Sequence, residues 1–141
     1  AVDIINQANQ LIREGKYAEA YEHVKSVDND MRAYNTVGVA LMMQGEFEKA
    51  MPWFEKKGIC DQIQRAVVSI ASNIAEGSAR PSDAEFAHFL DIALGSAYEV
   101  ETLFLISHKI GYIDAENYDS LNQKIISIER QITGLIKTIR K

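Results

Sequence analysis

Residues 38–54, with the sequence GVALMMQGEFEKAMPWF, decide the fold because they repeat a pattern that occurs thirty positions earlier, in ANQLIREGKYAEAYEHV at residues 8–24. Each copy has a small residue, a leucine, a glycine, an aromatic residue and an alanine at the same spacing. The small residue, Ala8 or Gly38, allows two helices to approach closely. The glycine, Gly15 or Gly45, ends a helix where a left-handed backbone is needed. The repeat therefore predicts two antiparallel helical hairpins.

The second copy resembles the tetratricopeptide repeat in the order and spacing of eight residues. These are Tyr34, Val37, Gly38, Leu41, Gly45, Phe47, Ala50 and Phe54. Proteins of this family bind peptides through the first helix of each repeat, so the resemblance implies a peptide groove. The residues at groove-facing motif positions are Asn9, Arg13, Arg32, Asn35 and Met42. Ile5 stands where the family's carboxylate-binding set has a lysine, and two repeats make a short groove.

The apolar spacing changes after Gly58. Three later segments carry apolar residues at alternating steps of three and four, which is typical of helix bundles. One segment, from Phe86 to Phe104, has a second apolar stripe that includes Ile92 and Ile106, so it is either central or shared with another subunit. In total, we predict seven helices, over residues 2–14, 17–27, 31–44, 46–57, 60–76, 82–110 and 115–140.

Residues 59–141 resemble the four-helix-bundle family encoded by intervening sequences in bacterial 23S rRNA genes. The matching blocks are Asp61-Gln62-Ile63-Gln64-Arg65-Ala66, Ser72-Asn73-Ile74-Ala75-Glu76-Gly77, and Ala93-Leu94-Gly95-Ser96 with Glu99, Glu101 and Thr102. The resemblance implies an up-and-down bundle that forms a homo-oligomeric ring, commonly a pentamer, without enzymatic activity. Ala71 replaces the proline that is usual in the family. The family's first helix is absent, and we expect residues 46–57 to take its place.

These two resemblances predict an all-α fold in which tetratricopeptide-like hairpins continue into an up-and-down bundle. The predicted domains are residues 1–57, with the helical repeats, and residues 58–141, with the bundle whose first helix comes from about 46–57. A fusion that shares a helix between its two parts fits this arrangement. We interpret it as an engineered chimera, with a natural fusion as the alternative. Pro52 lies inside the expected shared helix and could kink it.

Charge and composition exclude some classes of function for this protein. The formal net charge is −5, and both residues 1–57 (seven Lys/Arg, nine Asp/Glu) and residues 58–141 (eight against eleven) are acidic. Neither half has the positive field of a nonspecific nucleic-acid binder. No apolar run approaches the length of a membrane span. With the single cysteine Cys60, this favours a cytoplasmic protein without disulfides.

We expect the residues that could take part in catalysis or metal binding to have structural roles instead. Glu85 and His88 have the spacing of a di-iron ligand pair, but no second copy exists, so we expect a solvent-exposed pair. Asn73, Glu76 and Glu99 form either a carboxylate site or, as we prefer, a structural polar network. Cys60 lies near an expected helix start but has no histidine partner nearby in sequence. We therefore predict no catalytic residue, no metal and no cofactor.

The sequence thus predicts a non-enzymatic scaffold that self-assembles through its bundle. One alternative is a peptide-binding adaptor that uses the repeat groove. A second alternative is a nucleic-acid-associated bundle, which the excess of acidic over basic residues disfavours.

Overall fold

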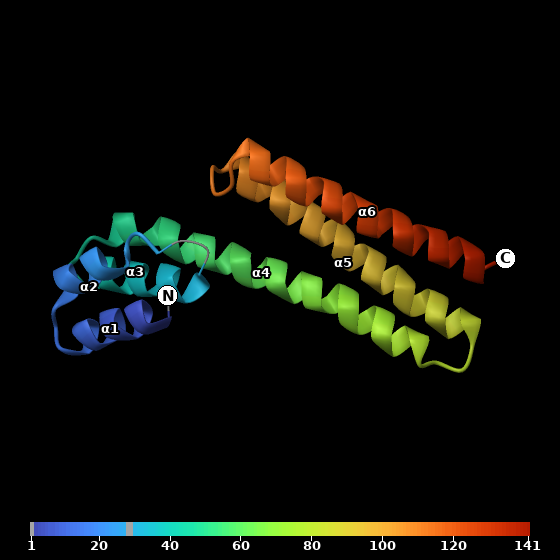
Figure 1. The fold of residues 1–141 in the computed structure, drawn as a ribbon, viewed down its shortest axis with the longest axis horizontal. Coiled ribbons are helices and arrows are strands. Elements are labelled where there is room, and N and C mark those ends of the chain that lie inside the picture. The colour runs from blue at the N-terminus through green and yellow to red at the C-terminus, as the bar shows by residue number, and fades with distance from the viewer. Residues whose placement is uncertain (1, 28–29) are drawn as a thin grey trace. The chain divides into compact units, whose positions relative to one another are not determined.

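In the computed structural model, the described residues, 2–27 and 30–141 with the side chain of Met31 excepted, form helices and no strands (Figure 1). There are six helices in this part of the chain: α1 (Val2–Arg13), α2 (Tyr17–Val24), α3 (Met31–Met43), α4 (Phe47–Ser78), α5 (Asp83–Lys109) and α6 (Ala115–Ile139). The prediction of an all-α fold is confirmed. The chain divides into two compact units, Ala1–Asp61 and Gln62–Lys141, so α4 contributes to both.

The prediction of separate helices over residues 46–57 and 60–76 is wrong, because α4 runs without a break through Pro52 and Gly58. Glycine in a helix costs only about 1 kcal/mol relative to alanine. The Lys57 ammonium also bonds the Asp61 carboxylate at 2.7 Å across Gly58, which supports this turn of the helix. Since one continuous helix contains both segments, residues 46–57 cannot turn back beside residues 60–76 as a separate first bundle helix.

The core of the first unit contains residues from the four helical segments of its repeat pattern. They are Ile5, Ala8, Val24, Ala33, Val37, Leu41 and Ala50, with Trp53 and Phe54 packed against them. Gly15 and Gly45 follow α1 and α3 with φ of 78° and 80°, which confirms the predicted left-handed helix ends. A Cβ on Gly38 would lie 2.7 Å from the ring of Phe54, so the close approach expected at this position is also confirmed.

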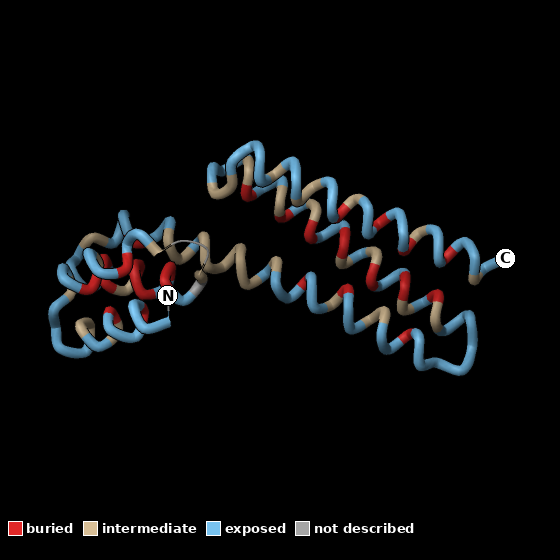
Figure 2. Tube along the Cα trace, viewed as in Figure 1, coloured by how far each residue is buried: buried red, intermediate tan, exposed pale blue. Residues whose placement is uncertain are grey.

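The second unit packs the C-terminal part of α4 with α5 and α6. Figure 2 shows buried positions recurring along α5 and α6, on the sides that meet. The first predicted stripe of α5 forms this core, through Leu90, Ala93, Ala97 and Val100. The second stripe is partly open to solvent, because Ile92 is 41% exposed and Ile106 is 42% exposed. Three antiparallel helical segments therefore make up this unit.

The ends of α5 are set by short polar contacts and by a close glycine. Ser82 is the N-cap, and its Oγ accepts from the backbone N–H of Glu85 at 3.2 Å. Gly77 lies in the last turn of α4, which ends at Ser78. A Cβ on Gly77 would lie 2.6 Å from Cβ of Phe89, so glycine lets α4 and α5 approach here.

Candidate functional site

The predicted peptide groove lies on α1 and α3, which Asn9 and Thr36 connect. The Thr36 hydroxyl lies 3.0 Å from Asn9 Oδ1 and 2.9 Å from the backbone carbonyl of Arg32. Thr36 is buried, although no motif position had marked it, because α3 presents it to α1. Asn9 therefore contributes to helix packing, and its carboxamide oxygen already has a partner.

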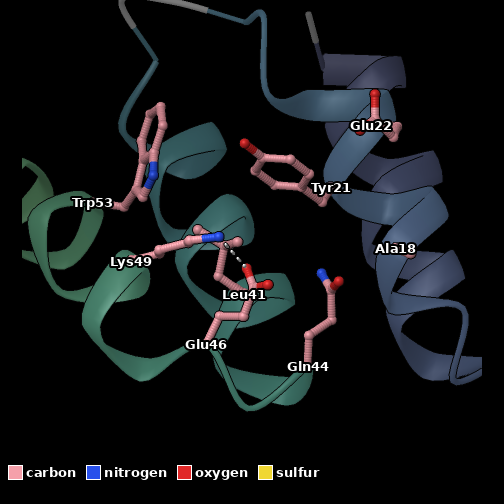
Figure 3. A pocket seen from close by; sticks show the side chains of 8 residues that line it. All are labelled: Ala18, Tyr21, Glu22, Leu41, Gln44, Glu46, Lys49 and Trp53. Carbon is pink, nitrogen blue, oxygen red and sulfur yellow. Dashed lines mark ion pairs between the residues drawn. The ribbon is translucent and has the colours of Figure 1, made fainter.

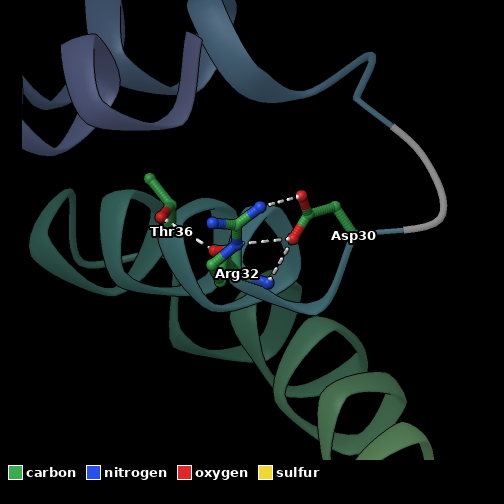
Figure 4. A network of polar contacts seen from close by, with 3 residues as sticks. All are labelled: Asp30, Arg32 and Thr36. Atoms are coloured by element: carbon green, nitrogen blue, oxygen red, sulfur yellow. Dashed lines mark hydrogen bonds and ion pairs between the residues drawn. The ribbon is translucent and has the colours of Figure 1, made fainter. Parts of the chain in front are cut away.

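Arg32 is held by the residue that caps its own helix (Figure 4). Asp30 accepts from the backbone N–H of Arg32 at 3.0 Å, and the Arg32 guanidinium donates to the same carboxylate at 2.8 Å. The hydrogen bond from Arg32 lowers the pKa of Asp30. Asp30 is the N-cap of α3.

The remaining groove candidates are open to solvent. Arg13 donates to Gln10 on its own helix at 2.8 Å. Asn35 is exposed, and Met42 is 38% exposed. The structure thus joins Asn9 to the α3 segment that carries Arg32, and leaves Arg13, Asn35 and Met42 available on the surface of the same unit.

A pocket of about 510 Å³ lies between α2, α4 and the end of α3, and no motif predicted it (Figure 3). Tyr21 and Trp53 supply ring surfaces, while Glu46 and Lys49 form an ion pair of 3.6 Å beside them. The other lining residues are Ala18, Glu22, Leu41 and Gln44. Rings and charges together suit an amphipathic side chain. The pocket depends on how three helices meet, which spacing within one helix does not reveal.

The polar network of the second unit differs from the predicted one. Asn73 donates to Ser69 Oγ at 3.1 Å, and Ser69 Oγ lies 2.7 Å from Ser96 Oγ on α5. Glu76 instead pairs with Arg80 at 2.7 Å, and Glu99 is exposed. Serine hydroxyls are short enough to connect α4 and α5 where these helices are close, so they take the place expected for the carboxylates.

A second polar feature, also missed, is a pair of glutamates at the α5–α6 contact. Glu129 is only 8% exposed, and its Oε2 is buried without a hydrogen-bond partner among the described residues. Burial, followed by the hydrogen bond and charge of Glu101, raises the pKa of Glu129 to about 7. The spacing of Ile125, Glu129 and Ile132 was a usable signal, because it places Glu129 in an apolar seam.

An apolar groove runs between α4 and α6, with α5 at its base, and has a volume of about 290 Å³. Two of its apolar side chains face solvent, since Val67 is 46% exposed and Ile128 is 38% exposed. One charged residue, Lys124, lines it. The full lining is Val67, Ile70, Ala71, Val100, Phe104, Leu121, Lys124, Ile125 and Ile128. We call this surface the α4–α6 groove.

The candidates for metal binding and catalysis were Glu85, His88 and Cys60. Glu85 accepts from the Ser82 hydroxyl at 3.1 Å, and both Glu85 and His88 are exposed, as predicted for this pair. In the described part of the chain, no three His, Cys, Asp or Glu residues are grouped as a metal site requires. Cys60 lies inside α4 rather than at a helix start, and burial raises the pKa of its thiol.

The helices of the described residues are not of the membrane-spanning kind. None of them combines the length and apolar character that crossing a membrane requires.

Comparison with known proteins places most of the chain in one family. A family model described as 23S rRNA-intervening sequence protein matches residues 36–134, which include part of α3, all of α4 and α5, and most of α6. Residues 1–35 lie outside the matched range. No curated protein and no solved structure matches the chain.

Proposed function

Because the chain belongs to the family of 23S rRNA-intervening sequence proteins, we propose that it is a non-enzymatic helical scaffold that self-associates through the α4–α6 groove. The second unit supplies the contact between copies, and the first unit is displayed by the resulting assembly. This extends the expectation of a homo-oligomer, which rests on the family resemblance of residues 59–141.

One observation carries this proposal: the α4–α6 groove exposes apolar side chains from two helices over a third helix. Exposed apolar area costs roughly 25 cal/mol per Å², so covering the groove is favourable. Lys124 is its one charged lining residue, and it can extend its ammonium to solvent at the rim of a contact. Contiguous apolar surfaces of this kind typically mark sites of association.

A second copy is the occupant we propose, because the chain also carries exposed apolar side chains on the other stripe of α5. Ile92 is 41% exposed and Ile106 is 42% exposed. A groove on one copy and an exposed apolar stripe on the next would form a heterologous contact, and repetition of such a contact closes into a ring when the rotation allows. Ring assembly is thus consistent with these two surfaces.

The test compares charged substitutions inside and outside the groove by sedimentation velocity. We expect Ile128→Asp and Val67→Asp to reduce the assembly to monomer, because each places a carboxylate against apolar groups. Val68→Asp is the matched control: Val68 is adjacent and 64% exposed, but does not line the groove, so its assembly should persist. Circular dichroism checks that each variant remains helical. Unchanged assembly in both folded groove variants would refute the proposal.

A peptide-binding adaptor is the second candidate function, and the exposed Asn35 and Met42 of the first unit favour it. Met42 offers adaptable apolar contact, and Asn35 can bond a peptide backbone. We expect Asn35→Ala combined with Met42→Ala to weaken binding of peptides on an array at least tenfold, whereas Glu48→Ala on α4, also exposed, leaves it unchanged. An array without any bound peptide would count against this function.

A further inference from the structure

Two side-chain contacts fix how α5 and α6 lie along each other. Near one end of the pair, Arg140 Nη2 donates to Asp91 Oδ2 at 2.6 Å. Near the other end, the rings of His108 and Tyr118 stack with centroids 4.7 Å apart. Glu101 lies ten residues after Asp91, and Glu129 lies eleven residues before Arg140. At about 1.5 Å per residue, the two glutamates are at the same height to within about 2 Å.

Glu129 occupies a core position of α6 that is otherwise apolar. It belongs to the row of Ile125, Ile132 and Ile136, which are all buried. Its side chain is 92% buried (8% exposed), and the Oε2 atom has no hydrogen-bond donor in the part of the chain that the structure describes. Glu101, on the facing helix, is half-buried. A carboxylate in such a place would be strongly destabilising if it were charged and unpaired.

Among the described residues, the groups around this pair provide no cation that neutralises it. From α4, Ala66 and Ile70 enter the same core, and neither can carry a charge. On α5, the titratable neighbours of Glu101 are Tyr98 and Glu99, both exposed. On α6, the basic residues nearest in sequence to Glu129 are Lys124 and Arg130, which are exposed and form none of the ion pairs found among the described residues.

We propose that Glu101 and Glu129 share one proton, which acts as a pH-dependent latch between α5 and α6. With one proton present, one carboxyl group donates a hydrogen bond to the other carboxylate, and the pair carries a single negative charge. When that proton leaves, two carboxylates face each other in the seam, and their repulsion opposes the packing of the two helices.

The direction of the pH effect follows from the titration of Glu129. Burial, then the hydrogen bond and charge of Glu101, raises its pKa to about 7 in the folded chain, from an ordinary value of 4.5. Between these two values, the folded state holds a proton that the unfolded state has released. Stability is therefore highest below this range, falls as the pH rises through it, and is constant above it as far as this pair is concerned.

The first test follows the thermal unfolding of the full chain and of Glu129→Gln from pH 5 to pH 8. Glutamine donates to Glu101 at every pH, so the variant lacks the proton-dependent step. We expect the midpoint of the wild-type chain to fall by about 5 °C relative to that of Glu129→Gln across this range. Since the two proteins share every other titratable group, the difference between their unfolding midpoints is the readout. Glu99→Gln, an exposed substitution on α5, should retain the wild-type profile.

The second test needs no substitution and measures the proton directly. The side-chain carboxyl ¹³C resonance of Glu129 in the folded wild-type chain should titrate with a midpoint near 7. Parallel pH profiles for wild type and Glu129→Gln would overturn the proposal. A midpoint near 4.5 for Glu129 would also overturn it, even if the variant failed to fold.

Discussion

Gly38 and Gly58 show how the surroundings of a residue decide what a glycine does. Both lie within helices, α3 and α4 respectively. A side chain at Gly38 would meet the ring of Phe54, whereas a Cβ at Gly58 would have no such neighbour within 4 Å. The first glycine therefore allows two helices to pack, and the second only adds backbone freedom to the unfolded chain.

We predict that Gly38→Ala destabilises the chain by about 1–3 kcal/mol, because the ring of Phe54 must shift within a packed core. Gly58→Ala is the matched control, and it should stabilise by about 0.5–1 kcal/mol through its helix propensity. Urea unfolding followed by circular dichroism measures both changes. Equal effects of the two substitutions would show that the close contact at Gly38 has no energetic weight.

At the residue scale, the sequence revealed those groups whose partners are nearby in the chain. The glycines at 15 and 45 and the exposed Glu85–His88 pair depend on neighbours within a few residues. The Glu101–Glu129 pair depends on the register of α5 and α6, so residues far apart in sequence decide it. The Ser69–Ser96 contact at 2.7 Å likewise joins residues that are far apart in the sequence.

At the scale of elements, α4 is the main departure from expectation. The change in apolar spacing after Gly58 was real, since the boundary between the two units follows Asp61. That change, however, reflects which neighbours the helix contacts. It does not interrupt the helical backbone. No proline or capping contact interrupts the helix there, and α4 continues to Ser78. In a sequence, a change of packing partner and a helix end therefore produce similar changes in apolar spacing.

The α4–α5 hairpin depends on the absence of a side chain at Gly77, and this gives an element-scale prediction. We expect Gly77→Ala to destabilise the second unit by about 1–3 kcal/mol, because its Cβ would lie 2.6 Å from Cβ of Phe89, an atom close to the backbone. Gly134→Ala, within α6 and without a neighbour inside 4 Å, is the control and should be neutral or stabilising. Hydrogen exchange of α5 amides measures the effect; unchanged protection in Gly77→Ala would contradict it.

At the scale of the whole molecule, one continuous helix, α4, contributes to both compact units. The family match starts at residue 36, inside α3, so it includes the entire shared helix. The tetratricopeptide-like character of the first unit, and the engineered origin considered for the chain, remain predictions. The second unit consists of three antiparallel helical segments with an open α4–α6 groove. The family resemblance had implied four helices.

The mass of the full chain in solution tests the central claim most directly, because an uncovered α4–α6 groove should be covered by another copy. Light scattering coupled to size-exclusion chromatography, over chain concentrations up to the millimolar range, gives that mass without a label or a substitution. We predict a discrete mass equal to several times 15.8 kDa. A mass of 15.8 kDa at every concentration would contradict self-association and leave the groove without its proposed occupant.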